Sequence, residues 1–185
     1  MREQPILNSD RLLLRPFTFT DAPRIQNLAG KREIADTTVS IPHPYSLSRA
    51  EEWIAGHPRE FSEGKATHFA IECKEIQQLI GAIALRDIER EHLQGELGYW
   101  VGVEFWGRGY ASEAARTAIA YGFEVLHLHR IYAYHMARNS ASGRVLQKLG
   151  MRQEGLLRDR VRKWDIFEDV CLYAILEEEW RDTNC

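Results

Sequence analysis

The segment from Trp106 to Ala111 (WGRGYA) constrains the fold most, because it stands between a predicted strand and a long predicted helix. Gly107 and Gly109 lack side chains, so backbone N–H groups can converge on an anion at the helix N-terminus, where the helix dipole favours negative charge. A dinucleotide-binding fingerprint would need a third glycine in place of Ser112, and a Walker A loop would need Gly-Lys-Ser/Thr, which the chain lacks. The segment therefore predicts another kind of anion cradle. The alternative is a turn whose glycines serve backbone geometry alone.

Three strands are predicted before this loop, because hydrophobic residues recur with period two from Ala66 onward. They cover residues 68–72, 79–85 and 95–103, and the short polar turns between them are typical of an antiparallel meander. The third strand is expected to alternate between two faces, with Leu97, Tyr99 and Val101 on one and Glu96, Gly98 and Trp100 on the other.

The flanking segments predict a mixed α/β (α+β) chain. A strand at 11–15 precedes a helix that Thr20 would cap, and a second helix follows a Pro-rich break, capped by Ser46 or Ser48. The helix after the loop runs to about Leu126. Its small residues at helical spacing, which would let its backbone lie close to a sheet, are Ala111, Ala115, Ala118 and Gly122. The remaining predicted elements are a strand at 130–135, a helix at 140–148 ended by Gly150, and strands at 152–162 and 166–175. This order favours one mixed sheet with flanking helices over a doubly wound parallel sheet.

Composition excludes several classes of protein. The chain has 185 residues and a net charge of −3, and no repeat or linker divides it, so a single domain over residues 1–185 is expected, with no nucleic-acid binding by bulk charge. Cys73, Cys171 and Cys185 stand far apart, which indicates neither a disulfide framework nor a zinc site and suits a reducing compartment. His127 and His129 lack carboxylates at ligand spacing, so no metal is expected. No segment is apolar enough for a signal sequence or a membrane span, and a cytoplasmic location is expected.

The loop and its surroundings resemble the GNAT acyltransferases, and within them the ribosomal-protein N-terminal acetyltransferases of the RimJ/RimL type. The general family pattern is Gln/Arg-x-x-Gly-x-Gly/Ala, in which Trp106 replaces the first residue. A W-G-[KR]-G-Y-A string followed by Ser/Thr-Glu-Ala is typical of this branch, and Ser112-Glu113-Ala114 supplies the second part. Four further strings match the branch in order: Arg11 to Pro16; Pro44-Tyr45 with Ala50 to Ile54; Asn139 to Ser142 with Leu146 to Met151; and Glu154 to Arg158 with Asp169 and Tyr173.

The resemblance implies a GNAT fold, in which two parallel strands splay apart and acetyl-CoA binds between them. Backbone groups of the strand before the loop would pair with the pantetheine arm, the loop amides would hold the pyrophosphate, and Lys148 or Arg144 would approach the nucleotide end. The cofactor-binding residues implied in this way are Val101, Gly102, Val103, Gly107, Arg108, Gly109, Tyr110, Ala111, Ser112, Asn139 and Lys148. A solvated basic surface is the alternative for Arg108, Arg144 and Lys148, and a helix cap is the alternative for Asn139.

Glu96 and Ser142 are the candidate catalytic residues. Glu96 occupies the acidic position of the family's Glu-x-Gly-Tyr-Trp segment and would act as general base, directly or through water. Ser142, in the Asn-x-x-Ser segment, would donate a proton to the departing thiolate, and a backbone N–H would hold the oxyanion. The alternatives are an ion-paired strand carboxylate for Glu96 and a capping or packing hydroxyl for Ser142.

The resemblance implies an acetyl-CoA-dependent N-acetyltransferase that acts on the N-terminal α-amine of a protein, such as a ribosomal protein. A small-amine acceptor (polyamine, amino acid or antibiotic) and a non-catalytic acyl-CoA-binding module are the alternatives. An acidic lining would favour a polycation, and the residues that could provide one are Glu51, Glu52, Glu60 and Glu63. His43, Tyr45 and Trp53 could line the acceptor entrance, although aromatic residues at helical spacing are also typical of a core. The sequence leaves the oligomeric state open.

Overall fold

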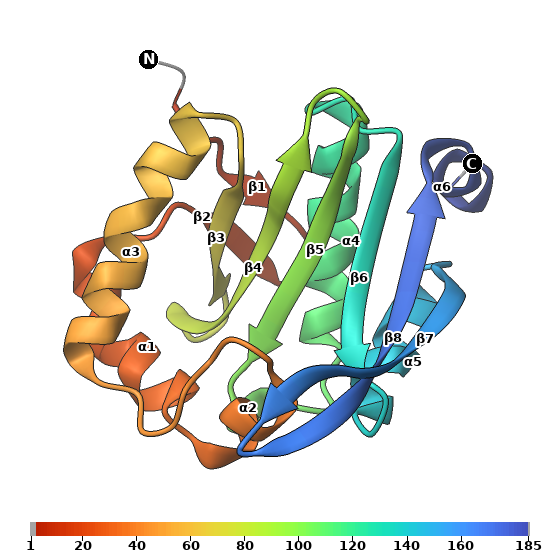
Figure 1. Ribbon diagram of the computed structural model, residues 1–185. Helices are drawn as coiled ribbons and strands as arrows, with labels where there is room; N and C mark the ends of the chain where they lie inside the picture. The colour runs from red at the N-terminus through yellow and green to blue at the C-terminus, as the bar shows by residue number, and fades with distance from the viewer. Residues whose placement is uncertain (1–2, 185) are drawn as a thin grey trace.

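A computed structural model describes residues 3–184 of the chain (Figure 1). Cys185, one of the cysteines considered above, lies outside the described residues. The strands are β1 (Leu7–Asn8), β2 (Leu12–Arg15), β3 (Thr67–Cys73), β4 (Gln78–Glu89), β5 (Gln94–Val101), β6 (Arg130–Met136), β7 (Arg152–Lys163) and β8 (Ile166–Leu176). The helices are α1 (Ala22–Ala29), α2 (Arg32–Thr37), α3 (Leu47–Ser62), α4 (Tyr110–Glu124), α5 (Ser140–Lys148) and α6 (Glu177–Asn184), with short 3-10 helices η1 (Phe19–Asp21) and η2 (Val103–Phe105).

The strands form one mixed eight-stranded sheet in the order β1-β2-β3-β4-β5-β6-β8-β7. Strands β3, β4 and β5 are antiparallel neighbours, so the predicted meander is confirmed. Strands β5 and β6 are parallel, and their pairing extends only from Gln94 opposite Arg130 to Glu96 opposite Tyr132. Beyond that point the two strands diverge toward their C-terminal ends, as Figure 1 shows. The fold class predicted from the sequence is therefore confirmed, including the splayed parallel strands.

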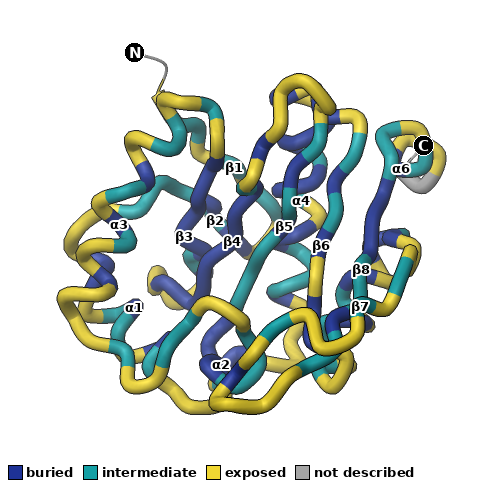
Figure 2. The backbone as a smooth tube through the Cα atoms, viewed as in Figure 1, coloured by how far each residue is buried: buried dark blue, intermediate teal, exposed yellow. Residues whose placement is uncertain are grey.

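Helices cover both faces of the sheet, and β3 shows how. His68 stacks on His57 of α3 with ring centroids 4.1 Å apart, whereas Phe69 packs edge-on against Tyr121 of α4 at 5.7 Å. Successive residues of a strand point to opposite faces, so α3 and α4 lie on opposite sides of the sheet. The inner strands β3 and β4 are consequently buried along most of their length, as the dark blue tube in Figure 2 shows.

Helix α4 lies close to the sheet through its small residues, as predicted. A Cβ atom added at Gly122 would stand 2.7 Å from Ile131 Cδ1 and 2.9 Å from Leu85 Cδ1. Ala115 and Ala118, on the same helix face, are fully buried. The absence of larger side chains on this face therefore sets how near α4 approaches the sheet.

Several local predictions need correction. Thr20 does not cap the first helix. Thr18 caps the 3-10 helix η1, where its backbone N–H donates to the Asp21 carboxylate at 2.8 Å, and Asp21 is the N-cap of α1 that follows. The third strand of the meander ends at Val101 rather than residue 103, since the chain turns into η2 once the Phe105 N–H donates to Gly102 O at 2.9 Å. Of the two proposed caps for α3, Ser46 is the one whose hydroxyl accepts from Arg49 N–H, at 3.2 Å.

Strand β1 and helices α2 and α6 were not anticipated from the sequence. Each is short, and helix α2 has only six residues, so no amphipathic period is long enough to reveal it. Within residues 3–184, no helix combines the length and the apolar character needed to cross a membrane.

Candidate active site

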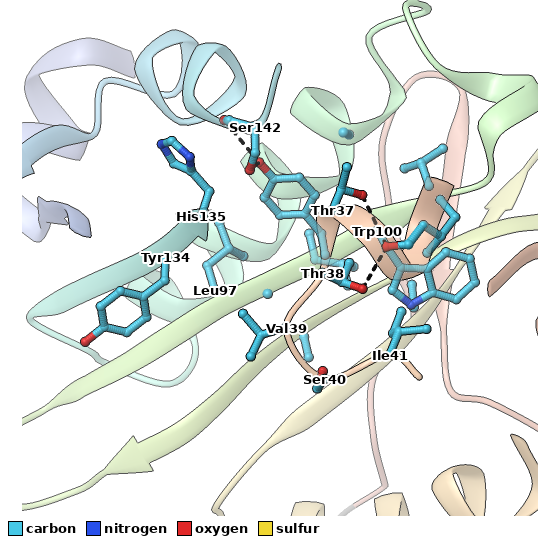
Figure 3. A pocket seen from close by; sticks show the side chains of 18 of the residues that line it. Thr37, Thr38, Val39, Ser40, Ile41, Leu97, Trp100, Tyr134, His135 and Ser142 are labelled. Atoms are coloured by element: carbon cyan, nitrogen blue, oxygen red, sulfur yellow. Dashed lines mark hydrogen bonds between the residues drawn. The ribbon is translucent and has the colours of Figure 1, made fainter. Parts of the chain in front are cut away.

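One cavity of about 1250 Å³ runs through the gap where β5 and β6 diverge. At one end it reaches the loop and first turn of α4, including Gly109 and Ser112, and at the other end it reaches Trp53 and His68. Ser142 and the segment Thr37 to Ile41 also line the cavity, as Figure 3 shows. A cavity of this size exceeds the range of about 300–1,000 Å³ typical of a single small-molecule site, which suits two substrates that meet.

The predicted anion cradle has the backbone conformation that its glycines allow. Gly107 and Gly109 have φ values of +74° and +81°, in the left-handed region where a side chain is strained, and Gly109 is the N-cap of α4. The 15-residue helix that follows directs its dipole and its first N–H groups at the cavity end where Gly109, Tyr110, Ala111 and Ser112 lie. The cradle geometry supports a phosphate-bearing ligand here.

The strand before the cradle already uses several of its backbone groups. Trp106 Nε1 donates to Val101 O at 2.6 Å, and Gly102 N–H donates to Ile80 O at 2.8 Å. Val103 O accepts from Trp106 N–H at 3.1 Å. The prediction that residues 101–103 pair with the pantetheine arm is therefore limited to the remaining groups of this stretch.

Two of the three predicted basic side chains line the cavity. Arg144 and Lys148 of α5 do so, whereas Arg108 is exposed outside it, with its guanidinium 5.9 Å from the Phe105 ring centroid. Arg144 also donates to Ser140 Oγ at 3.1 Å. Of the three, only Arg144 and Lys148 therefore add basic side chains to the lining of the cavity.

Ser142 and Asn139 lie in the first turn of α5. Asn139 is the N-cap: its Oδ1 accepts from Ser142 N–H at 3.2 Å, and its Nδ2 donates to Thr37 O at 3.3 Å. The helix-cap alternative therefore describes Asn139 as it stands, and a contact with the pantetheine amide would require it to exchange the Thr37 contact. Ser142 Oγ lies 2.8 Å from Tyr99 OH, the dashed line at Ser142 in Figure 3.

Tyr99 is a member of the site that sequence reasoning placed on the correct strand face but gave no role. Burial raises the pKa of Tyr99 to about 12, and the hydrogen bond with Ser142 opposes that rise only in part. The phenol therefore stays protonated at neutral pH. The sequence did contain a signal for this role: Tyr99 shares a strand face with the buried Leu97 and Val101, and a phenol on a buried face requires a hydrogen-bond partner.

Glu96 lies on β5 at the last pair before the strands diverge. Its side chain is 12% exposed, and Arg86 Nε and Nη2 both donate to its Oε1. The ion-pair alternative is therefore present in the structure. Oε2 accepts no hydrogen bond from the described residues and remains available to a ligand or a water molecule in the cavity.

The far end of the cavity is aromatic rather than strongly acidic. His57 packs against Trp53 and Phe17 at ring-centroid distances of 4.5 and 5.2 Å, and neither of its ring nitrogens has a hydrogen-bond partner among residues 3–184. Burial, followed by repulsion from His68, lowers the pKa of His57 to about 3. His68 Nε2 lies 2.6 Å from the Glu60 carboxylate.

Of the glutamates considered for an acidic lining, only Glu60 lines the cavity. Glu63 pairs with Arg59 and Lys65 at 2.7 Å each, and Glu51 and Glu52 are exposed on α3.

Tyr45 and Trp53 both line the cavity and pack against the core, so both interpretations of these aromatic residues apply. His43 is exposed, with its Nδ1 3.1 Å from Gly30 O, and does not line the cavity. Among the described residues, no three His, Cys, Asp or Glu side chains gather to hold a metal ion.

Diverging parallel strands with an anion cradle at their mouth define an acyltransferase of the GNAT fold. The family model described as "Acetyltransferase (GNAT) domain" matches residues 11–152, so the chain belongs to the GNAT family of N-acetyltransferases. It is 32% identical over 173 residues to the uncharacterized N-acetyltransferase YoaA of Bacillus subtilis, which covers 94% of this chain and 97% of that protein.

Relatives with named acceptors include both protein and polyamine acetyltransferases. The chain is 30% identical to the [ribosomal protein uS5]-alanine N-acetyltransferase of Escherichia coli, over 95% of this chain and 86% of that protein. It is 26% identical to a spermidine N(1)-acetyltransferase of Vibrio cholerae, over 93% of this chain and 96% of that protein. A solved GNAT-family acetyltransferase from Bacillus anthracis superposes with a TM-score of 0.83 at 27% identity, covering 94% of this chain and 99% of that chain.

Proposed function

We propose that this chain binds acetyl-CoA at the N-terminus of α4 and transfers the acetyl group to the N-terminal α-amine of a protein, with a ribosomal protein as the leading acceptor. The observation that carries the proposal is the single cavity, which joins the Gly109 cradle to Ser142 and Glu96. The anionic end of a cofactor and an amine can therefore enter from opposite sides and meet where the strands diverge. A ribosomal acceptor would place the reaction in the cytoplasm.

The ligand fits the chemistry of the residues present. The α4 amides would hold its pyrophosphate, while Arg144 and Lys148 would stand near its nucleotide end. When bound, acetyl-CoA supplies an acetyl thioester, whose thiol has an ordinary pKa of about 8.5 and leaves with little help.

The protein's contribution is the handling of two protons. Oε2 of Glu96 would accept a proton from the attacking amine, directly or through water, while Oε1 stays held by Arg86. Tyr99 would donate a hydrogen bond to Ser142 Oγ, which turns the Ser142 hydroxyl into the cavity, where it would give its proton to the leaving sulfur. Glu96 would then release the amine's proton to solvent and Ser142 would regain one from solvent, so the protons balance in each turnover.

The charge of the cavity lining and the ordinary pKa values of amines both favour an α-amine over a polyamine. The acceptor side of the cavity offers Glu60, Asp87 and Glu96, but Arg49, Arg86 and Arg160 line it as well, so it has no excess of negative charge to hold a polycation. An α-amine has an ordinary pKa of about 7.7–8.0, whereas deprotonating a lysine of pKa about 10.4 costs roughly 3.5 kcal/mol more. Glu96, whose carboxylate is also paired with Arg86, suits the acceptor amine that is easier to deprotonate.

Release of free thiol from acetyl-CoA tests the acceptor class. The acceptors would be a peptide with the N-terminal sequence of ribosomal protein uS5, the same peptide with a blocked N-terminus, spermidine, and single amino acids. We expect release with the free peptide alone, and mass spectrometry should place the acetyl group on its first residue. Turnover of spermidine with no turnover of the peptide would assign the chain to the small-amine class instead. Binding of acetyl-CoA with turnover of no amine would support a non-catalytic module.

A further inference from the structure

We propose that Arg11, just before β2, is a positioning residue that holds the acetyl-CoA loop in its binding conformation. This inference rests on the proposed binding of acetyl-CoA at α4. It concerns how the start of β2, which does not line the cavity, holds the backbone of the cradle in place.

Arg11 bridges both sides of the cradle. Its Nη1 donates to Arg108 O at 3.1 Å, in the loop before α4. Its Nε donates to Glu113 Oε2 at 2.7 Å, and its backbone N–H donates to Glu113 Oε1 at 2.8 Å, in the first turn of α4. The guanidinium also lies over the Tyr110 ring, 4.7 Å from its centroid. A single side chain thus contacts three positions across the start of the helix.

The contact with Arg108 O bears directly on anion binding. In a trans peptide the carbonyl oxygen and the next N–H point in opposite directions, so an Arg108 carbonyl held toward Arg11 turns the Gly109 N–H away from Arg11. Gly109 lines the cavity, whereas Arg11 does not. The guanidinium therefore stabilises the orientation of the Arg108–Gly109 peptide in which its N–H is free for a ligand in the cavity.

Trp106 anchors the start of the loop to Val101 and Val103, but the two glycines that follow contribute no side-chain contacts of their own. Gly107 has no atom within 4 Å of the place where its Cβ would stand, and both glycines adopt left-handed conformations that other residues reach only with strain. Ordering a glycine-rich loop at the moment of binding would cost conformational entropy. A loop ordered beforehand by Arg11 avoids that cost, so the ligand binds more tightly.

Arg11 also neutralises a carboxylate that would oppose an anion. Glu113 lies in the first turn of α4, where a negative charge stabilises the helix but repels a phosphate nearby. Its side chain is 17% exposed, and its oxygens accept from Arg11 and from Ser9 Oγ, the latter at 2.8 Å. Although burial opposes it, these donors hold the pKa of Glu113 below its usual range, so the carboxylate stays ionised and paired.

Calorimetric titration of the full chain with CoA tests the inference, using Arg11→Met and Arg11→Lys. Loss of the hydrogen bonds in Arg11→Met should raise the Kd of CoA by about tenfold. Lysine keeps the charge but not the planar fork that reaches Arg108 and Glu113 together, so Arg11→Lys should remain close to Arg11→Met. Pantetheine lacks the pyrophosphate, and its binding should be the same in all three proteins.

Arg130→Met is the matched control, because Arg130 also pairs with a glutamate, Glu154, through two nitrogens but lies outside the cavity. It should bind CoA like the unaltered protein. Full recovery of CoA affinity in Arg11→Lys would show that charge alone matters, and an equal loss for pantetheine would show general damage. Either result overturns the inference, as does unchanged affinity in Arg11→Met. Failure of the unaltered protein to bind CoA would overturn the proposed function itself.

Discussion

Ser142 illustrates how much of the chemistry depends on individual residues. Its hydroxyl has a partner, Tyr99, whose phenol is held protonated by burial, and its backbone N–H has a second partner, Asn139. The serine is thus fixed at both ends in the first turn of α5. A donor fixed in advance needs no reorientation at the moment of reaction.

Tyr99→Phe should lower kcat by roughly tenfold, because it removes one hydrogen bond worth on the order of 1 kcal/mol at the transition state. Ser142→Ala should lower kcat further, and adding Tyr99→Phe to Ser142→Ala should have no additional effect if the tyrosine acts through the serine. Steady-state rates of thiol release measure all three variants. Tyr121→Phe, at a buried tyrosine beside Phe69, is the control and should retain full activity. Additive losses in the double variant would contradict the proposal that Tyr99 acts through Ser142.

His57 gives the protein a pH-dependent stability. Its pKa is about 3 in the folded chain and about 6.5 in the unfolded chain. Between these values the unfolded state binds the additional proton, so the contribution of His57 is full above pH 6.5 and declines as pH falls toward 3. The decline approaches about 1.4 kcal/mol per pH unit.

Urea unfolding of the protein and of His57→Phe at pH 7, 5.5 and 4.5 measures this contribution. The phenylalanine keeps the contacts with Phe17 and Trp53 but binds no proton. We expect the free energy of unfolding of His57→Phe to exceed that of the unaltered protein by a margin that grows as the pH falls. Parallel pH profiles for the two proteins would show that His57 does not titrate on unfolding.

At the scale of elements, two glycines in helices should respond in opposite ways to the addition of a side chain. Gly56 of α3 has open space where its Cβ would stand, whereas Gly122 of α4 faces Ile131 and Leu85 at under 3 Å. Gly56→Ala should raise the free energy of unfolding by about 0.5–1 kcal/mol, since alanine is the better helix former. Gly122→Val should lower it by about 1–3 kcal/mol through overpacking.

Thermal unfolding followed by circular dichroism measures both variants. The sign of each change matters more than its size, because the two sites share the residue type and the helical setting and differ in the distance to the sheet. Destabilisation by Gly56→Ala would contradict the open space at this position of α3, and stabilisation by Gly122→Val would mean that α4 does not pack on the sheet as the structure has it.

The elements also show what could be predicted from the sequence. The meander, α4 and α5 were predicted at the correct places, because each has a clear hydrophobic period or a small-residue stripe, although β4 continues to Glu89 rather than ending at residue 85. Helix α2 and the loop from Thr37 to Ile41, which line the cavity, have no such period. Contacts distant in sequence hold them in place, such as the Arg138 pair with Asp36 at 3.0 Å and the Lys163 bond to Ile41 O at 2.7 Å. No pattern within a short window contains both partners of these contacts.

The candidate site shows the same difference between features set by a local string and contacts made by distant residues. Gly107, Gly109 and Ser142 could be located from local strings, since a turn and a helix N-terminus are local features. The Arg86 partner of Glu96, the Tyr99 partner of Ser142 and the Arg11 partner of Glu113 come from other elements. The residue types of a site were therefore predictable, whereas the hydrogen bonds that orient them depend on how the sheet brings separate strands and helices together.

For the molecule as a whole, the central claim is that the cavity between β5 and β6 binds acetyl-CoA with its pyrophosphate at the α4 cradle. Calorimetric titration with acetyl-CoA of the unaltered protein and of Gly109→Val tests it most directly. The account predicts one site per chain in the unaltered protein and loss of binding in Gly109→Val, because a branched side chain at φ +81° would displace the loop amides. Binding of equal affinity in both proteins, or no binding in the unaltered protein, would contradict it.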